Sequence, residues 1–576
     1  MYVESVPNRN SRPAILLRES CRQGRRVLKR TLANLSDWPA QKIETLRRLL
    51  RDEPLVASTD LFTTVRTMSH GHVEAVLGTI RRLGLDRVIS SSPCRERDLV
   101  VAMVAARILF PSSKLATSRL WHTCTLAEEL GLGEETDVDE LYEALDWLLA
   151  RQKKVEGKLA KRHLADSTMA LYDVSSSFYY GHCTLALLGH DRDGKHHLPI
   201  IVYGLLTDRQ GCPVAVSVYP GNTGDPTTVP DQVTRLREEF GLSEVVLVGD
   251  RGMLTRTQLK VLGEHPGLGW ISALRSAAIR KLIDDGPLQL SLFEERNLAE
   301  ITSPDYPGER LVACFNPLLA EERRRKREEL LEETEKELGK ISREAARRTR
   351  SPFTDAELGL KVGRVVNRFK VAKHFELTIA QGQLSFQRNT PAIRRESELD
   401  GIYVVRTNQS AERLSAEDAV RSYKSLAEVE QAFRCLKQTD LLIRPIRHRT
   451  EDHIRAHVFL CMLAYYVDWH MRRSLAPLLF EDEELDESRL RRDPVAKARP
   501  SASVSAKKIE RRTKDGLPVL DFATLLAALA TRARNTYRMK TDDSTIPATL
   551  TQITDPSPLQ SRAFELLGLY PVTSNP

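Results

Sequence analysis

Apolar residues follow a helical rhythm along the first part of the chain and a strand-like rhythm after residue 167. Apolar positions at helical spacing predict helices over 72–86 and 98–110, and one long amphipathic helix over 137–163. Beyond them, β-branched and aromatic residues gather in short runs separated by turn residues, a pattern typical of strands. The sequence therefore predicts a helical region followed by a strand-rich one.

The strand-rich region has a definite order of elements. STMALYDVSSSFYY, HHLPIIVYGLLTD and CPVAVSVYPG predict three strands, the last two joined by a turn at 208–211. A helix over 228–240, the strand EVVLVGD, a helix over 254–263 and the strand GWISALR follow. This β-β-β-α-β-α-β order is that of a ribonuclease H-like core, so we expect an α+β or α/β fold with a mixed catalytic sheet.

The first 51 residues are strongly basic. Residues 13–33 predict two strands around a turn near Gln23-Gly24, and a short helix is expected over 39–51. The span 1–51 holds twelve Lys and Arg residues and four acids, which equals the formal net charge of +8 of the whole chain. Such a basic patch suits a polyanion such as nucleic acid, although a merely soluble surface has the same composition.

A helix pair before the first strand offers a second region for DNA. Ser112 or Ser113 is placed to cap a helix that runs to about Trp121, directly after the apolar helix 98–110. Helix, short turn and helix is the arrangement of a helix-turn-helix DNA reader, but most such pairs are plain bundle packing. The sequence leaves both interpretations open.

The second half of the chain predicts an insertion, a return to the core and a basic end. A charge-dense helix at 319–350 is expected to be solvated, over or between domains, and strands are expected at 374–387 and 400–408. An apolar helix at 451–471 precedes a basic segment, 486–515, which we interpret as a mobile linker or a DNA-touching segment. A short helix at 520–534 and a low-order tail are expected to close the chain. The expected regions are a basic hairpin and helix (1–60), a helical DNA-binding region (61–165), a core in two parts (166–276 and 411–480), an insertion (277–410) and a basic linker with a helical tail (481–576).

Neither cysteine usage nor hydropathy points to a membrane or an oxidising compartment. The eight cysteines are scattered without a CxxC pair, which is typical of reduced thiols and does not favour a zinc ribbon. The apolar runs Leu99–Phe110 and Val458–Val467 are too short or too interrupted to span a bilayer, and the first residues lack an apolar signal core. We therefore expect a cytoplasmic protein without a membrane partner.

Three carboxylates are the best candidates for chemistry. Asp173 lies inside a predicted strand, where burial of a lone carboxylate is costly, and Asp250 ends another strand, where it would also suit the start of a turn. Glu430 lies on a predicted helix that can pack over the same sheet edge. Converging carboxylates form a site for Mg²⁺ or Mn²⁺, and two such ions can promote attack on a phosphodiester.

The predicted helix YKSLAEVEQAFRCLK carries the third carboxylate. Tyr423, Glu430 and Lys437 are seven residues apart, close to two helical turns, so they share one face, and Arg434 lies on the same side. An ordinary solvent-exposed helix with i,i+4 ion pairs has the same pattern of charged residues. Next to a metal site, however, the phenol and the cations would hold neighbouring phosphates.

Other motifs give weaker signals. The serines at 175–177 lack a G-x-S-x-G setting, and the chain has no P-loop and no GxGxxG. Imidazole groups can bind a transition metal, but no HExxH acid accompanies the histidines of this chain. The candidates are the histidine pair 196–197 and the residues His448, His453 and His457. We interpret these histidines as surface or DNA-contact residues.

At these motifs the chain resembles the DDE transposases of bacterial insertion sequences, and more closely their class-four superfamily. That family places its third carboxylate in a Y-x2-R-x3-E-x6-K signature, and Tyr423, Glu430 and Lys437 have this spacing. Leu426 stands where the family has arginine, which is a departure from the pattern. LYDVSSSFYYG resembles the first aspartate motif and LVGDRGM the second, and the resemblance covers roughly 165–470, including a long insertion before the glutamate.

The resemblance implies a site and a reaction. Asp173, Asp250 and Glu430 would be catalytic and would hold two Mg²⁺ ions, with Mn²⁺ as a substitute. The implied DNA contacts are Tyr423, Lys437, Arg434, Lys424 and Arg251, with Arg434 or Lys424 replacing the missing arginine. The protein would cut each terminal inverted repeat, join the freed 3′-hydroxyl to target DNA, and act as a dimer on double-stranded DNA in the bacterial cytoplasm, at the nucleoid.

Two alternatives remain. One is a nuclease with the same fold that cleaves DNA without strand transfer. The other is a transposase-derived DNA-binding protein that no longer cuts, which the departure at Leu426 leaves open.

Overall fold

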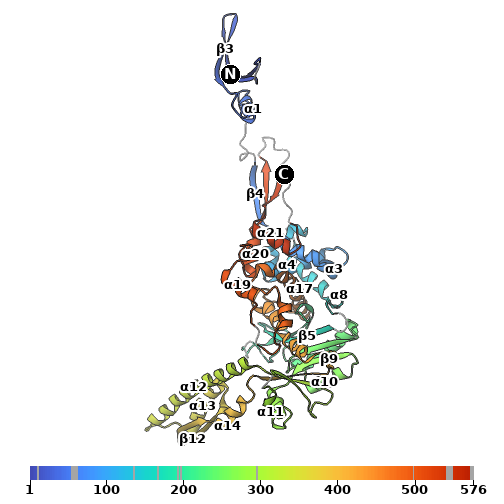
Figure 1. Cartoon of the computed structure of the whole chain (residues 1–576), viewed down its shortest axis with the longest axis vertical. Coiled ribbons are helices and arrows are strands. Elements are labelled where there is room, and N and C mark those ends of the chain that lie inside the picture. The colour runs from blue at the N-terminus through green and yellow to red at the C-terminus, as the bar shows by residue number, and fades with distance from the viewer. Residues whose placement is uncertain are drawn as a thin grey trace. The chain divides into compact units, whose positions relative to one another are not determined.

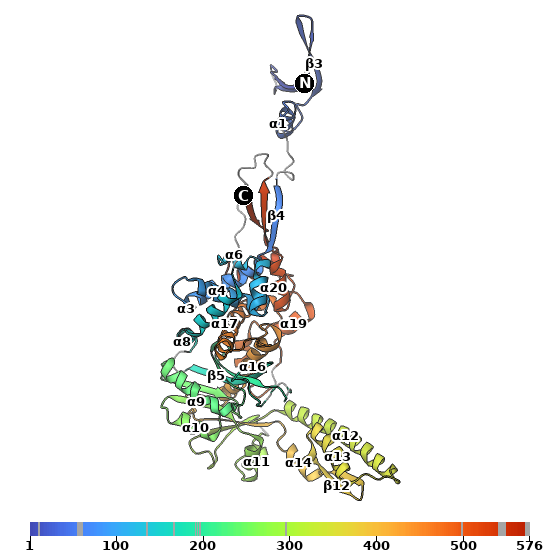
Figure 2. The ribbon, with the colours of Figure 1, turned by 180° about the vertical axis from the view of Figure 1, so that it is seen from behind.

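The computed structural model shows two compact units within the chain (Figures 1 and 2). The smaller unit comprises residues 1–68 and 533–555, and the larger unit begins at Ser69, runs to Arg532 and resumes at Pro556. Side chains are not described at 168, 290, 439, 486 and 539. The structure describes residues 1–9, 12–53, 62–133, 136–164, 168–190, 192, 194, 197–293, 296–496, 499–539 and 549–570.

The described residues of the smaller unit form two three-stranded sheets and one helix. Its first sheet has the order β1-β2-β3 and its second the order β16-β15-β4. The predicted basic hairpin and helix are confirmed as β2, β3 and α1, and Gly24, with φ of +59°, takes the left-handed position in the hairpin turn. β3 is exposed along its whole length. The elements are β1 (Tyr2–Val6), β2 (Ala14–Gln23), β3 (Arg26–Asn34), α1 (Ala40–Leu49), β4 (Phe62–Ser69), β15 (Ala533–Met539) and β16 (Thr549–Ile553).

An eight-stranded mixed sheet is the centre of the larger unit. Its order is β10-β11-β14-β9-β8-β5-β6-β7, with β5, β6 and β7 antiparallel to one another and with β5, β8 and β9 parallel. The predicted β-β-β-α-β-α-β sequence of elements is confirmed by β5 to β9 with the helices α9 and α10. These elements are β5 (Thr168–Phe178), β6 (Ile200–Asp208), β7 (Pro213–Pro220), α9 (Val229–Thr234), β8 (Val245–Gly249), α10 (Arg256–Gly263) and β9 (Leu268–Ala273).

The register of the central strands decides where two of the candidate acids lie. In the parallel pair β5 and β8, Tyr172 is opposite Gly249. One step further along are Asp173, in the middle of β5, and Asp250, directly after β8, so the two aspartates lie at the same level of neighbouring strands. β6 is buried at every position, and β8 at all but one, as expected for strands in the middle of a sheet.

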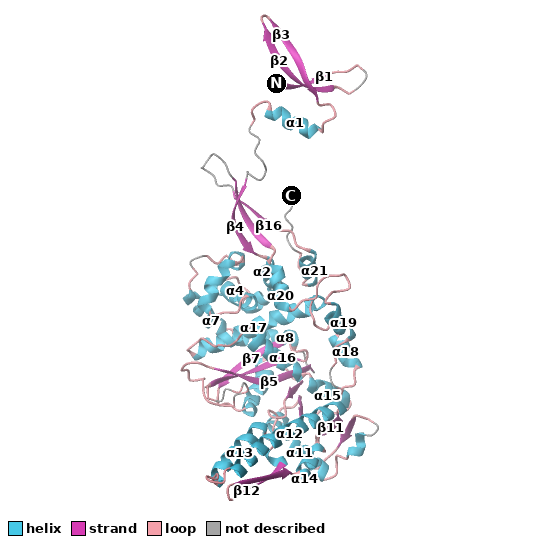
Figure 3. Cartoon of the chain, turned by 90° about the vertical axis from the view of Figure 1, so that its left-hand side faces the viewer, coloured by secondary structure: helices cyan, strands magenta, loops and turns pink. Residues whose placement is uncertain are grey.

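The insertion is partly built into this sheet, which the sequence did not predict. It adds β10, β11 and β14 beyond β9, so only one of its two predicted strand regions stays outside the sheet. That region is the β12–β13 hairpin, which packs with α12 and α13 around a small core of its own; these elements lie side by side in Figures 1 to 3. The insertion consists of α11 (Ser276–Asp284), β10 (Leu298–Ile301), β11 (Arg310–Phe315), α12 (Pro317–Arg347), α13 (Asp355–Phe369), β12 (Phe375–Ala380), β13 (Gln383–Arg388), α14 (Thr390–Ser397) and β14 (Ile402–Thr407).

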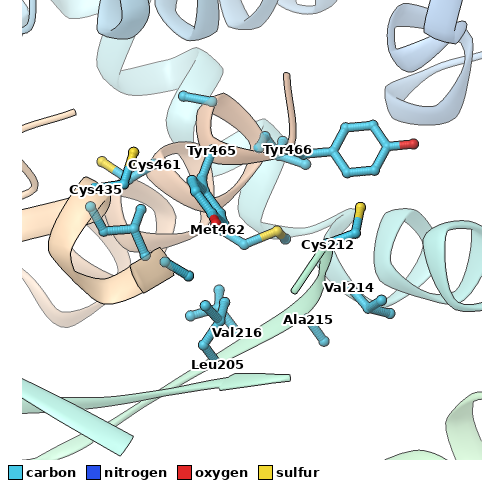
Figure 4. Close-up of a cluster of buried hydrophobic side chains, with 14 of the residues drawn as sticks. Leu205, Cys212, Val214, Ala215, Val216, Cys435, Cys461, Met462, Tyr465 and Tyr466 are labelled. Atoms are coloured by element: carbon cyan, nitrogen blue, oxygen red, sulfur yellow. The ribbon is translucent and has the colours of Figure 1, made fainter. Parts of the chain in front are cut away.

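Helices that precede the sheet in the sequence pack against helices that follow it, and together they form a helical layer. The long helix α17 packs on α4, on α7 and on β7, and its buried side chains face those of β6 and β7 in Figure 4. Ser113 caps α5 by accepting the N–H of Ala116 at 3.2 Å, as predicted. The layer contains α2 (Gly71–Leu83), α3 (Leu85–Ile89), α4 (Arg95–Leu109), α5 (Lys114–Leu120), α6 (Leu126–Glu129), α7 (Val138–Leu149), α8 (Gln152–His163), α17 (Glu451–Leu475), α20 (Phe522–Ala530) and α21 (Pro558–Leu566).

The predicted single helix over 137–163 is wrong, because the chain forms α7 and α8 with a break at Ala150 and Arg151. The two halves pack on different partners: α7 on α4 and α17, and α8 on β7 and α3. The fully buried Glu156 anchors α8 by accepting the N–H of Val216 on β7 at 3.0 Å. A straight helix cannot serve both sets of partners.

The helix pair α4–α5 is packed into this layer. Every residue from Leu99 to Ile108 of α4 is buried, and α5 packs on α7, an arrangement that matches the bundle interpretation. Among the described residues no single helix is long and apolar enough to cross a membrane; the pair Arg95–Leu109 and Lys114–Thr123 passes that test only when joined across a 90° bend.

The end of the chain is more ordered than the sequence predicted. The basic segment 486–515 forms two short helices, α18 (Leu485–Arg491) and α19 (Ala502–Glu510), in place of a mobile linker. Between them Val495 is buried, and the buried Lys507 donates to the carbonyls of Ala476 and Glu481. The expected low-order tail instead contains the strands β15 and β16 and the helix α21, in which Phe564 is fully buried.

Candidate active site

All three candidate carboxylates line one cavity of ≈ 840 Å³ in the larger unit. Asp173 comes from β5, Asp250 from the loop after β8, and Glu430 from α16 (Leu426–Arg434), which packs on β5. The other lining residues are mostly polar: Val174, Ser175, Arg192, Asp225, Arg251, Tyr423, Lys424, Leu426, Ala427, Phe433, Arg434, Lys437 and Gln438. The cavity therefore joins the strand motifs and the helix motif that lie far apart in the sequence.

The predicted helix over 423–437 is not one regular helix. Tyr423 lies near the end of α15 (Ala416–Lys424), a turn at Ser425 precedes α16, and a wide π-type turn, Cys435–Thr439, contains Lys437. The backbone at Ser425 keeps helical angles (φ −65°, ψ −13°), so the direction of the chain changes little. Tyr423, Glu430 and Lys437 consequently still face the same cavity.

Asp173 is half-buried, and its charge is poorly compensated. Burial raises the pKa of its carboxyl to about 7, and the nearby charges of Asp250 and Asp225 add to the rise. The backbone N–H of Val174 and the guanidinium of Arg192 oppose it. A bound cation would relieve this excess of negative charge.

Asp250 is exposed but held in place by its neighbours. The Tyr423 hydroxyl donates to its Oδ1 at 3.2 Å, and its backbone carbonyl accepts the N–H groups of Met253 at 3.0 Å and Leu254 at 3.2 Å. Burial, and then the charge of Asp250, raise the pKa of Tyr423 above its ordinary value. The phenol therefore remains a hydrogen-bond donor to the carboxylate at neutral pH.

Glu430 is exposed and lines the same cavity from α16. The oxygens of the three carboxylates are not all within 4.8 Å of one another, so the three line a shared cavity without forming a closed ligand shell. Open carboxylate sites of this kind suit Mg²⁺, which retains several waters and takes only one or two protein carboxylates.

The five predicted DNA contacts also line this cavity, in different environments. Arg251 and Arg434 are exposed, whereas Lys437 is buried with its Nζ 6.0 Å from the centre of the Tyr203 ring. Lys424 donates to the backbone carbonyls of Val495 and Ala496, both at 3.0 Å. Its ammonium thus already fixes the segment before α19, which weakens the case that it replaces the arginine missing at Leu426.

Two further cavity residues escaped the sequence analysis. Asp225 follows β7 in the turn GNTGDP, and Arg192 pairs with it at 2.5 Å. An aspartate in a Gly- and Pro-containing turn indicates only the turn itself, so no local signal pointed to the site. Asp225 comes near Asp173 because of the sheet order. Only β6 separates β7 from β5, so the turn after β7 lies close to β5.

The histidine interpretation needs correction. His448 and His457 are buried, not on the surface, and burial lowers the pKa of His448 to about 3. Nε2 of His457 lies 3.0 Å from the carbonyl of Ile443, and the His453 ring stacks on Tyr142. His196 lies outside the described residues.

Comparison with known families agrees with the geometry of the cavity. Residues 184–467 match the family described as Transposase DDE domain; Asp250 and Glu430 lie within the match, and Asp173 precedes it. No curated protein is significantly similar to the chain in sequence. This match supports the interpretation of the chain as a DDE transposase, a class of proteins of mobile elements. This interpretation implies DNA as a partner and, as in DDE transposases generally, use of a divalent metal ion.

Proposed function

We propose that the protein is a cut-and-paste transposase of a bacterial insertion sequence of the class-four superfamily. It would bind terminal inverted repeats, hydrolyse a phosphodiester at each end and join the 3′-hydroxyls to target DNA. The observation that carries the proposal is the single cavity in which Asp173, Asp250 and Glu430 meet the cations of the Glu430-bearing segment.

A core that is compatible with the ribonuclease H-like fold supports this proposal. The strand order β7-β6-β5-β8-β9, with three antiparallel strands and two parallel additions, matches the order expected for that fold. Asp173 and Asp250 occupy equivalent levels on the two adjacent parallel strands. Catalytic groups at strand ends are held by rigid backbone, which favours a fixed separation between them.

The acidic residues fit a pair of Mg²⁺ ions, with Mn²⁺ as a substitute. The donors are carboxylate oxygens, and the raised pKa of Asp173, to about 7, reflects its burial together with the charges of Asp250 and Asp225. Asp173, Asp250 and Glu430 would be the ligands, and the ions would stabilise charge that develops on the phosphate and its leaving oxygen.

The remaining groups of the cavity position the nucleic acid. The hydrogen bond from Tyr423 keeps one oxygen of Asp250 oriented, while Arg251, Arg434 and Lys437 would neutralise the phosphates beside the cleaved bond. None of these cations is needed as a proton donor. Their role is to hold the DNA backbone in register with the carboxylates.

The recognition of element ends is assigned to the basic amino-terminal region. β2, β3 and α1 carry most of the basic excess of residues 1–51, and β3 is fully exposed. Pairing of two ends requires a homodimer on DNA, acting at the bacterial nucleoid in the cytoplasm. The alternatives are a nuclease without strand transfer and an inactive DNA-binding relative.

A cleavage and strand-transfer assay tests the proposal. Purified protein is incubated with supercoiled plasmid that carries the flanking DNA of its own gene, with Mg²⁺ or without a divalent ion. Excision with joined products, lost in Asp250→Asn, supports a transposase. Cutting without joining supports the nuclease, and binding without cutting supports the inactive relative.

A further inference from the structure

Three metal-ligating side chains meet in the larger unit, away from the carboxylate cavity. His163 ends α8, Cys212 lies in the turn between β6 and β7, and His470 belongs to α17. One ligand atom of each lies within 4.8 Å of the others, and no other such group of His, Cys, Asp or Glu is found among the described residues. We name these three residues the imidazole–thiol cluster.

The distances in the cluster are close to those of a metal site. Cys212 Sγ is 4.0 Å from Nε2 of His163 and 3.9 Å from Nε2 of His470. Zinc bonds of about 2.3 Å to sulfur and about 2.0 Å to nitrogen, at tetrahedral angles, put sulfur and nitrogen about 3.5 Å apart. The two sulfur–nitrogen distances therefore need to contract by only a few tenths of an ångström. The ligand nitrogens of the two histidines lie within 4.8 Å of each other and would have to approach to about 3.3 Å on one ion.

A carboxylate supports this arrangement from behind. Asp208 Oδ2 is 3.7 Å from Nδ1 of His163, the ring nitrogen that does not face the thiol. Its Oδ1 accepts the N–H groups of Gln210 at 2.8 Å and Cys212 at 2.9 Å. The same carboxylate thus fixes the turn that carries the cysteine. It also lies behind the imidazole, where carboxylates support metal-bound histidines, although 3.7 Å is longer than a hydrogen bond.

The protonation states of the histidines suit a metal. Burial lowers the pKa of His163 to about 4 and that of His470 to about 3, so both rings are neutral at pH 7. Nε2 of His163 also lies 3.0 Å from the Tyr466 hydroxyl, a contact that a bound ion would replace. Cys212 is fully buried, as Figure 4 shows beside α17, and burial raises its pKa well above the ordinary value. Binding of a divalent cation would stabilise the thiolate and reverse that rise.

Two arginines near the thiol are engaged elsewhere. Arg162 donates to the carbonyl of Leu83 at 2.8 Å and to the Tyr466 hydroxyl at 3.2 Å. Arg473 donates to the side-chain oxygen of Gln210 at 2.7 Å and lies over the Trp469 ring. Their charges favour the thiolate, and with Asp208 they leave the surroundings of the cluster mixed rather than purely cationic.

We propose that His163, Cys212 and His470 bind one Zn²⁺ ion that fastens the end of α8 and the β6–β7 turn to α17. Imidazole and thiolate ligands select zinc over Mg²⁺, which prefers oxygen. The ion would hold three packed elements together, and none of its ligands lines the carboxylate cavity. With three protein ligands, the fourth position of the ion would be left to water. The competing explanation is a hydrogen bond from the Cys212 thiol to one imidazole, with no ion.

Metal analysis of the full chain decides between these explanations. Protein purified without a polyhistidine tag and dialysed against excess Zn²⁺, then against metal-free buffer, should retain about one Zn²⁺ per chain. Co²⁺ in place of zinc should give the intense near-ultraviolet band of a thiolate–cobalt bond. Cys212→Ser and His470→Gln should each lower retained zinc roughly tenfold or more and abolish that band.

Cys461→Ser is the matched control. Cys461 is also buried on α17, and its sulfur lies 3.8 Å from Nε2 of His457, but it belongs to no three-ligand group among the described residues. It should retain zinc. Asp208→Asn tests the supporting carboxylate and should weaken zinc affinity roughly 10- to 100-fold without changing the stoichiometry at saturation.

Several outcomes would overturn the proposal. One is wild-type protein that is folded by circular dichroism and retains no zinc and no cobalt band. Equal retention by wild type and Cys212→Ser would place the metal elsewhere. Neither readout requires DNA or cleavage, so a failed zinc site and a failed transposase assignment remain separate results.

Discussion

The carboxylate cavity and the imidazole–thiol cluster offer metal ligands in opposite ways. The cavity presents oxygens from β5, from the end of β8 and from α16, spread too widely to be all within 4.8 Å, around a space of ≈ 840 Å³. The cluster brings nitrogen and sulfur within 4.8 Å where α17 packs on the sheet. An open site leaves room for a polymer between its ligands, whereas a closed one leaves room only for an ion.

The pKa shifts at the two sites have opposite signs but the same cause. Burial raises the pKa of Asp173 to about 7 and lowers that of His470 to about 3, because low polarisability disfavours charge of either sign. At the cavity the metal would compensate the Asp173 carboxylate, which is partly ionised at pH 7. At the cluster it would have to displace a thiol proton, so binding there is coupled to proton release.

The largest expected effect is the loss of chemistry at the open site. Glu430→Gln should lower cleavage roughly 100-fold or more, because an amide replaces an anionic ligand, while DNA affinity changes little. Strand cleavage on gels and binding by fluorescence anisotropy give the two values. Glu428→Gln is the matched control, since Glu428 lies on the same helix but pairs with Arg489 outside the cavity; equal losses in both variants would contradict the assignment of Glu430.

The pH dependence of the free energy of unfolding should reveal the cost of burying the Asp173 carboxylate. The folded-state pKa of Asp173 is about 7 against an ordinary 3.8. Ionisation of this carboxyl therefore lowers the free energy of unfolding. The loss is absent below pH 4, grows as pH rises and is complete above pH 7. Asp173→Asn should therefore stabilise metal-free protein on the order of 3 kcal/mol at pH 8, and distinctly less at pH 5. Urea unfolding at both pH values measures this, and an equal gain at both would refute it.

Metal removal should separate the closed site from the open one. Phenanthroline, which binds zinc strongly and Mg²⁺ weakly, should lower the melting temperature of the wild type by about 3–6 °C, since loss of a ligand specific to the folded state removes its stabilisation. Cys212→Ser should show no such shift, and Cys461→Ser should behave like the wild type. A shift of the same size in Cys212→Ser would assign the effect to another ion.

The smallest effect concerns the cations around the open cavity. Arg434→Gln should reduce the slope of log affinity against log salt concentration by about 1, as expected for one lost phosphate contact. DNA-binding titrations over a series of salt concentrations measure the slope. Lys424→Gln is the comparison, because its ammonium is bonded to the carbonyls of Val495 and Ala496; an unchanged slope for Arg434→Gln would exclude it as a contact.

Local pattern was sufficient for the core strands and for most helices. The alternation and residue types of β5 to β9 gave their order, and the heptad spacing of Tyr423, Glu430 and Lys437 brought all three to one cavity despite the break at Ser425. Pattern failed where the partner decides the structure. The helix expected over 137–163 breaks because its halves pack on different elements. The tail contains α21 because Phe564 is buried against residues far away in sequence.

The sequence by itself determined the identity of the core elements and the three carboxylates, because periodicity and strand-end position are local properties that residues carry wherever they fold. Only the tertiary structure decided that the insertion extends the sheet, that Asp225 and Arg192 join the cavity, and that His163, Cys212 and His470 meet. These contacts link segments separated by tens to hundreds of residues. Their formation depends on the packing of α17 and the order of the strands, which no local pattern encodes.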